Sequence, residues 1–288
     1  MEGIIIANNA GKYVVYSDGV TYNVFAKGLF RYKAKKLNVG DRVIFNDESF
    51  TVDVILDRKN ELIRPRCANI DQLLIVMSVK QPELSVELIY KFLTYANMNA
   101  IPAKVVLTKI DLEDDFNQIN QLKDDLSKVG VEVFLFSPYE NKCIEEIKNL
   151  LKGKVSILMG QTGVGKSTLI NAIDKTYDRK IGEYSSALGR GKHQTKEVIL
   201  LPFENGFIGD TPGFSSLDLN IFKEDLAQFF PGYNQYYTHC YFSNCLHQKE
   251  KDCKIKAHLE SGNLSREAYT IYLKLLNELP YRKERYTL

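Results

Sequence analysis

The sequence has no long hydrophobic run, few cysteines and almost no net charge. Its apolar runs are only about five to seven residues long, whereas a membrane-spanning helix needs roughly 20. We therefore expect that the protein is not an integral membrane protein and has no membrane partner. The segment Met1–Ile4 has no basic stretch followed by an apolar one, so we expect no signal peptide. Five cysteines in 288 residues are too few for a disulfide scaffold, which indicates a reducing, cytoplasmic location.

Length and composition indicate a globular chain of more than one domain. A chain of 288 residues exceeds one typical domain, and 44% hydrophobic with 26% charged residues is ordinary for a folded protein. Changes in pattern place the boundaries at residues 1–62, 63–220 and 221–288. The formal net charge of +2 leaves no strongly charged tail. A monomer is the default expectation.

Residues 1–62 have the pattern of short strands separated by turns. Their apolar segments are rich in β-branched and aromatic residues, and Ser17–Gly19 and Asn46–Ser49 are typical turn clusters. The predicted strands are Tyr13–Tyr16, Thr21–Phe25, Asp41–Phe45 and Phe50–Ile55. About five short strands in this length favour a small β-barrel of the OB-fold type, with a fragment of a β-sandwich as the alternative.

Between residues 63 and 220, apolar strands alternate with helices. The apolar run Gln72–Met77 is typical of a buried parallel strand. Further strands are predicted at Ala103–Thr108, Val131–Phe136 and Val155–Met159, and helices at Val86–Met98, Phe116–Val129, Ile144–Leu151 and from about Lys166. This alternation predicts a three-layer α/β domain with a mostly parallel sheet. The strands stop after Gly213, and residues 221–288 are predicted to be α-helical and rich in loops.

The segment Gly160–Ser167 fits the phosphate-loop pattern G-x-x-x-x-G-K-[ST] between an apolar strand and a helix. Glycines let backbone N–H groups converge on phosphates, and the helix N-terminus favours the anion. We expect Lys166 to contact the β- and γ-phosphates and Ser167 to ligate Mg²⁺. The residues predicted to bind the nucleotide here are Gly160, Gln161, Thr162, Gly163, Val164, Gly165, Lys166, Ser167 and Thr168.

The motif Thr108–Asp111 predicts that the nucleotide is GTP or GDP. It stands at the C-terminal end of a predicted strand, where open α/β sheets bind ligands. Asp111 can accept hydrogen bonds from guanine N1–H and the 2-amino group, whereas adenine would leave it unpaired. The stem of Lys109 can lie over the base, and Thr108 stands where the common form of the motif has Asn. Ser137, after the next strand, either contacts the guanine oxygen through its backbone or only ends the strand.

The segment Asp210–Gly213 fits the pattern D-x-x-G after a short strand. Asp210 is expected to hold Mg²⁺ through water, and the Gly213 N–H to meet the γ-phosphate. The basic, glycine-rich segment Gly189–Thr195 suits a switch loop in which Thr195 becomes a second Mg²⁺ ligand. Most GTPases have the phosphate loop first, whereas here the base motif precedes it. The domain must therefore be circularly permuted, which attaches the C-terminal segment to the second switch.

The C-terminal segment contains three cysteines and one histidine in a stretch of 14 residues: Cys240, Cys245, His247 and Cys253. These residues offer a closed tetrahedral set, which predicts one structural zinc ion per chain. A catalytic zinc site would keep an open position. The alternative is a group of reduced buried cysteines beside an incidental histidine.

The segment Phe25–Lys36 has five basic residues, three aromatic residues and no acidic one. In a small barrel it would be a long loop between strands, whose lysines neutralise phosphates while Phe30 or Tyr32 stacks on unpaired bases. Alone it could equally be a solvated basic loop. Beside a GTPase and a zinc module, RNA is the better interpretation.

Together these motifs resemble the circularly permuted ribosome small subunit-dependent GTPase A (RsgA) family over nearly the whole chain. The motifs stand in the family's order, and Ala68–Gln72 at the start of the second segment is also typical of it. The resemblance implies an OB-fold domain, a permuted GTPase domain and a zinc domain. It also implies GTP hydrolysis stimulated by the small ribosomal subunit and its rRNA during late maturation of the subunit.

Hydrolysis needs a group that orients water, and the position after D-x-x-G, where Ras-like enzymes have Gln, is Phe214. His193 in the predicted switch can exchange a proton near neutral pH, and similar proteins are thought to use this histidine, so we predict it as the catalytic residue. A surface or RNA-contacting role is the alternative. Two other functions stay open, a nucleotide-gated RNA-binding module with incidental hydrolysis and an ATP-dependent small-molecule kinase, although Asp111 argues against the kinase.

Overall fold

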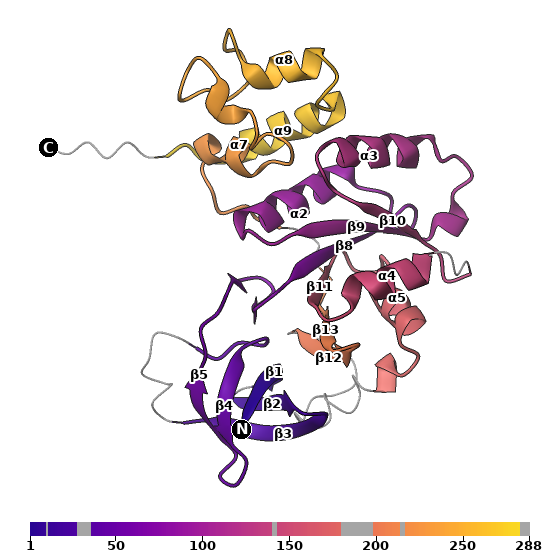
Figure 1. Cartoon of the computed structure of the whole chain (residues 1–288). Coiled ribbons are helices and arrows are strands. Elements are labelled where there is room, and N and C mark those ends of the chain that lie inside the picture. Colours follow the sequence, from indigo (N-terminus) through magenta and orange to yellow (C-terminus); the bar gives the residue numbers. More distant parts are fainter. Residues whose placement is uncertain (10, 28–35, 140–142, 180–197, 214–216, 283–288) are drawn as a thin grey trace, which may run out of the picture.

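The computed structural model in Figure 1 describes residues 1–9, 11–27, 36–139, 143–179, 198–213 and 217–282. The predicted switch segment with His193 and Thr195, and most of the basic segment after Phe25, lie outside these residues. Their predicted roles remain predictions.

The N-terminal strands form a closed barrel in the order β1-β2-β3-β5-β4. These strands are β1 (Glu2–Asn9), β2 (Lys12–Ser17), β3 (Val20–Ala26), β4 (Arg42–Asn46) and β5 (Thr51–Ile55). Strand β1 pairs antiparallel with both β2 and β4, and β3 pairs in parallel with β5, which closes the sheet. Along β4 the buried Val43 and Phe45 alternate with the exposed Ile44, as the period of a barrel strand requires. The barrel confirms the predicted OB-fold and adds β1, which was not among the predicted strands.

A six-stranded sheet in the order β10-β9-β8-β11-β13-β12 forms the middle of the molecule. Its strands are β8 (Gln72–Ser78), β9 (Ala103–Thr108), β10 (Val133–Phe136), β11 (Val155–Met159), β12 (Ile199–Phe203) and β13 (Gly206–Asp210). All neighbouring pairs are parallel except β12 with β13, which confirms the mostly parallel α/β prediction. Every residue of β8 is buried, as expected for a strand covered on both faces.

Helices cover both faces of this sheet. In Figure 1, α2 (Val86–Met98) and α3 (Asn117–Lys128) lie on one face, whereas α4 (Ile144–Leu151) and α5 (Lys166–Ile173) lie on the other. The chain runs from β8 to β9 to β10 in one direction across the sheet and then returns to β11 on the other side of β8. Because crossovers between parallel strands are right-handed, the reversal of direction places the later helices on the opposite face. Ligands bind at such a switch point, outside the carboxyl ends of the strands.

A short hairpin of β6 (Glu61–Leu62) and β7 (Cys67–Ala68) connects the barrel to the sheet. Next to it, Asn69 donates a hydrogen bond from Nδ2 to the Gly40 carbonyl at 2.9 Å. Gly40 has no room for a side chain, since a Cβ there would lie 2.1 Å from the Ala68 carbonyl oxygen. The Tyr16 and Phe207 rings, 5.5 Å apart, add a second contact between barrel and sheet.

The described C-terminal residues contain helices and loops but no strand, in line with the sequence pattern. They form α7 (Leu226–Phe229), α8 (Lys254–Glu260) and α9 (Arg266–Glu278), with 3-10 turns at Lys223–Asp225 and Tyr237–His239. Ser265 caps α9 by accepting the Ala268 N–H at 3.3 Å. Among the described helices, none has the length and apolar character to cross a membrane.

Helix α9 packs on α2 of the central region. Lys91 of α2 pairs with Glu278 of α9 at 3.0 Å, and Lys274 of α9 pairs with Glu87 of α2. Between them, the Tyr90 ring of α2 stacks on Phe230 at 5.3 Å. The same Phe230 ring meets Tyr272 of α9 edge-on, also at 5.3 Å. The C-terminal segment is thus attached through a buried aromatic cluster rather than through surface charges alone.

Candidate functional site

The predicted phosphate loop connects β11 to α5 in a conformation that requires glycine. A Cβ on Gly160 would lie 2.0 Å from the Val76 carbonyl oxygen, and Gly165 caps α5 with a left-handed φ of 94°. Lys166 donates from Nζ to the carbonyls of Gly160 and Gln161, both at 2.9 Å. Burial lowers the pKa of Lys166, an effect that the nearby Asp210 carboxylate opposes. The Lys166 ammonium is therefore held inside the loop by two of its carbonyls.

The predicted base motif lies directly beside this loop. Thr108 ends β9 with a buried side chain whose Oγ1 is 2.5 Å from the Val164 carbonyl oxygen and 3.3 Å from that of Met77. The hydroxyl has a single hydrogen, and the phosphate loop holds the nearer acceptor. Thr108, which stands where the common motif has Asn, thus joins the base motif to the phosphate loop.

The next residues of the base motif differ in how they are held. Lys109 has a left-handed φ of 57° and donates from Nζ to the Gln81 carbonyl. Asp111 is exposed in the 3-10 turn Ile110–Leu112, and among the described residues no hydrogen bond or ion pair is found for its carboxylate. Its oxygens are available to a ligand.

Ser137 follows β10 and is 1% exposed. Its Oγ accepts the N–H of Tyr139 at 3.2 Å, a local bond that shapes the turn after the strand. This contact supports the strand-ending interpretation. The contact of Ser137 with a guanine oxygen stays a prediction.

The D-x-x-G segment meets the phosphate loop from the neighbouring strand β13. A Cβ on Gly213 would lie 2.3 Å from Thr162 Oγ1 and 2.5 Å from Thr162 N, so only glycine fits there. Asp210 ends β13 and is buried, and desolvation raises its pKa above the usual value. Tyr177 donates from its hydroxyl to Asp210 Oδ2, whereas no partner is found for the buried Oδ1 among the described residues. No motif had pointed to Tyr177.

A divalent cation fits this arrangement. Ser167 at the start of α5 is exposed, and the Asp210 carboxylate has one buried oxygen without a hydrogen-bond partner in the described structure. Hydroxyl and carboxylate oxygens are the ligands that Mg²⁺ prefers. Asp210 lies near Lys166, which precedes Ser167 in the chain, while Thr195 lies outside the described residues.

The Cys/His residues form a second, separate centre. The ligand atoms of Cys240, Cys245, His247 and Cys253 all lie within 4.8 Å of one another. His247 Nδ1 is 3.5 Å from Cys240 Sγ and 3.4 Å from Cys253 Sγ. Burial raises the pKa of the Cys245 thiol to about 12 and lowers that of His247 to about 4. Three thiols and a neutral imidazole that converge in this way could hold a metal ion, whose positive charge would favour the thiolate form.

Tyrosines of α9 hold the loop that carries these ligands. Tyr269 donates from its hydroxyl to the His247 carbonyl at 2.7 Å, and Tyr272 to the Leu246 carbonyl at 3.3 Å. Glu250 accepts the N–H groups of Leu246 and Gln248 at 2.9 and 2.7 Å. These contacts orient the ligands from outside the cluster, as supporting residues do at metal sites.

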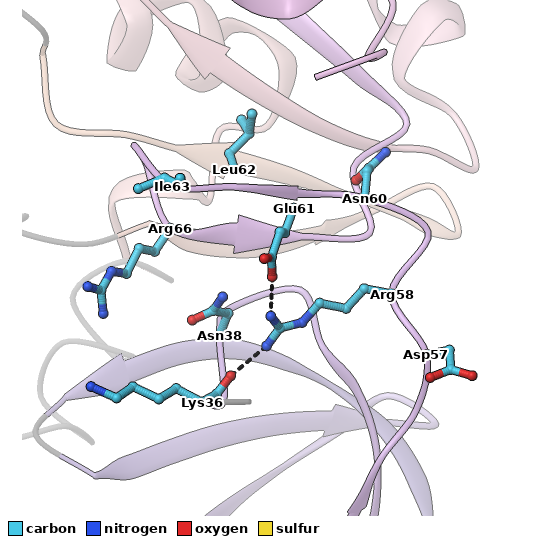
Figure 2. A pocket seen from close by; sticks show the side chains of 9 residues that line it. All are labelled: Lys36, Asn38, Asp57, Arg58, Asn60, Glu61, Leu62, Ile63 and Arg66. Atoms are coloured by element: carbon cyan, nitrogen blue, oxygen red, sulfur yellow. Dashed lines mark hydrogen bonds and ion pairs between the residues drawn. The ribbon is translucent and has the colours of Figure 1, made fainter. Parts of the chain in front are cut away.

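A pocket of about 770 Å³ lies between the barrel and the β6–β7 hairpin. None of its lining residues belongs to the nucleotide motifs or to the Cys/His cluster. Figure 2 shows that Arg58 points across it toward Glu61 and the Lys36 carbonyl. Arg58 also pairs with the buried Asp41 at 2.6 Å. For the Lys36 ammonium and the Arg66 guanidinium, no partner is found among the described residues, so two positive charges on this rim are available to a polyanion.

Comparisons with known proteins agree with the geometry. The model of the RsgA GTPase family matches residues 55–220. A protein named small ribosomal subunit biogenesis GTPase RsgA from Streptococcus agalactiae serotype V is 40% identical, over 99% of this chain and 98% of that protein. RsgA 1 of Listeria monocytogenes serotype 4b is 38% identical, over 99% of this chain and 100% of that protein.

Two solved structures are similar over almost their whole length. The crystal structure of YjeQ from Thermotoga maritima is 34% identical with a TM-score of 0.84, covering 98% of this chain and 99% of that one. YloQ, a circularly permuted GTPase, is 33% identical with a TM-score of 0.80, covering 99% of this chain and 96% of that one. These similarities confirm the permuted arrangement expected from the order of the motifs.

Proposed function

The chain belongs to the RsgA GTPase family, and we propose that it hydrolyses GTP while bound to the small ribosomal subunit, during the biogenesis of that subunit. The observation that supports the proposal is the hydrogen bond of Thr108 to Val164, which joins the motif expected to select guanine to the phosphate loop. The names of the similar proteins, small ribosomal subunit biogenesis GTPases, suggest the ribosomal partner.

The nucleotide would bind at the C-terminal ends of β9 and β11. Asp111 would accept the guanine N1–H and 2-amino group, and Lys109 would cover the base. The backbone of residues 160–168 would hold the phosphates, with Lys166 exchanging its loop carbonyls for phosphate oxygens. The Gly213 N–H would contact the γ-phosphate.

Ser167, Asp210 and Thr195 would hold the Mg²⁺ that accompanies the nucleotide. When bound, this ion neutralises charge on the β- and γ-phosphate oxygens. His193 would orient the attacking water once the segment Gly189–Thr195 is ordered around the γ-phosphate, and the small subunit would favour that ordered state. Turnover of the isolated protein would consequently be slow.

The three segments of the chain would have different roles. Residues 1–62 would contact rRNA through the basic segment Phe25–Lys36, and Arg66, for which no partner is found among the described residues, would add a positive charge on the rim of the pocket. Residues 63–220 would bind and hydrolyse GTP. Residues 221–288 would hold one structural Zn²⁺ through their Cys/His cluster and present a rigid surface to the subunit. The protein would act as a monomer in the cytoplasm.

The test is the rate of GTP hydrolysis with small subunits, large subunits or free RNA added in turn. We expect strong acceleration by small subunits only. Equal rates in all mixtures would favour the second candidate, a nucleotide-gated RNA-binding module whose hydrolysis is incidental, which the basic rim of the pocket also suits. Competition with ATP provides the control for base selectivity.

A further inference from the structure

Tyr177 lies beside the predicted Mg²⁺ ligands, and no motif accounts for it. Its side chain is 2% exposed, and its hydroxyl donates a hydrogen bond to Asp210 Oδ2. Since an ionised carboxylate only accepts, the Tyr177 hydroxyl is the donor of this bond. One buried hydroxyl from the turn after α5 therefore holds the first residue of the D-x-x-G motif.

The turn that follows α5 fixes the Tyr177 ring. Helix α5 ends at Ile173, and the Asp174 carboxylate accepts both the N–H of Thr176 at 2.8 Å and its hydroxyl at 2.6 Å. The Tyr177 N–H donates to the Asp174 carbonyl at 3.1 Å. A buried ring on a hydrogen-bonded turn leaves the hydroxyl little freedom, so Tyr177 is a rigid donor.

Asp210 needs such a donor because the last torsion of an Asp side chain is soft and roughly two-fold. The hydrogen bond from Tyr177 holds Oδ2 and leaves Oδ1 buried, with no hydrogen-bond partner in the described part of the chain. An unpaired buried carboxylate oxygen is unfavourable, so Oδ1 is ready for a metal-bound water. The nearby ammonium of Lys166 is already bonded to loop carbonyls.

We propose that Tyr177 is a positioning residue for the Mg²⁺ site, whose hydroxyl orients Asp210 toward the ion that accompanies the guanine nucleotide. This inference rests on the proposed function, because it concerns the same nucleotide site. The opposite role, in which the hydroxyl takes the place of the ion and competes with it, predicts an effect of opposite sign.

The test is Tyr177→Phe, which keeps the ring and removes only the hydroxyl. Binding of a fluorescent GDP analogue to the full chain is measured over a range of Mg²⁺ concentrations and in EDTA. We expect the half-saturating Mg²⁺ concentration to rise roughly tenfold, the equivalent of about 1.4 kcal/mol, while the affinity in EDTA stays unchanged. Tyr95→Phe is the matched control, since the buried Tyr95 donates its hydroxyl to the Arg64 carbonyl at 3.0 Å away from the site.

A double-variant cycle separates positioning from general packing. In an Asp210→Asn background, Tyr177→Phe should change the Mg²⁺ requirement by less than about twofold, because most of its effect passes through Asp210. An unchanged or lower Mg²⁺ requirement in the single variant overturns the role of Tyr177 and leaves the proposed function intact. Wild-type protein that binds no GDP at all overturns the proposed function and this inference together.

Discussion

Thr108→Val should weaken guanine-nucleotide binding although Thr108 need not touch the nucleotide. The side chain is 1% exposed, and its hydroxyl is 2.5 Å from the Val164 carbonyl oxygen of the phosphate loop. Valine fills nearly the same volume but leaves that carbonyl without its donor, in a place that water does not reach. A buried acceptor without a partner costs about 1–3 kcal/mol.

The phosphate loop can relieve this penalty by moving, and nucleotide binding must then restore the loop. A loss of about 1–2 kcal/mol would appear as a roughly 5- to 30-fold rise in the Kd for GDP. The assay is titration of a fluorescent GDP analogue at saturating Mg²⁺, together with urea unfolding of the same protein.

The matched control is Thr94→Val in α2. Thr94 is fully buried, and its hydroxyl donates to the Tyr90 carbonyl at 2.7 Å without contacting the phosphate loop. The Thr94→Val substitution should lower the free energy of unfolding but leave the Kd for GDP within about twofold of wild type. If Thr108→Val binds GDP as tightly as wild type, the link between base motif and phosphate loop carries no binding energy and the reasoning fails.

Three further predictions concern the base, the metal and the water. Asp111→Asn replaces one acceptor oxygen by a donor that opposes guanine, so preference should shift from guanine toward xanthine nucleotides in competition binding; equal GTP and ATP affinity of the wild type would contradict the role of Asp111. Purified protein should contain one zinc per chain by metal analysis, and Cys245→Ala should unfold the C-terminal helices by circular dichroism while GDP still binds; absence of zinc would refute the cluster's role. His193→Ala should lower subunit-stimulated hydrolysis by roughly 10²–10⁴-fold with GTP and subunit binding nearly unchanged; full stimulated activity would exclude His193 as the catalytic residue.

Most strands and helices of the central region could be predicted because each has its own periodicity, whereas β12 was not among the predicted strands. Strands β9 and β11 and helices α2 and α4 begin and end where the sequence placed them. Strand β10 begins at Val133, two residues later than the predicted start at Val131, because only the pairing with β9 decides which residues of an apolar run join a sheet. Strand β1 went unpredicted although Ile4–Ile6 is an apolar, β-branched run that signals a strand.

Some features of the candidate site could likewise be predicted from the sequence, and others could not. The phosphate loop and the base motif are local patterns whose glycines and carboxylate have fixed spacings, so the sequence alone places them. Tyr177 contacts Asp210 across 33 residues, and no spacing predicts a contact that depends on the turn after α5. The role of Thr108 was open for the same reason, since its partner Val164 lies 56 residues away.

The packing of α9 on α2 has a consequence for the synthesis of the protein. The two ion pairs between these helices join residues that are 187 positions apart. At about 5–20 residues per second, a ribosome would release α2 roughly 10–40 s before α9 is complete. Until Phe230 is made Tyr90 lacks its stacking partner, and until Tyr272 is made Phe230 lacks its own, so the nascent chain presents an incompletely covered apolar face. Among the described helices, the one made last, α9, is therefore the one that completes the core around α2.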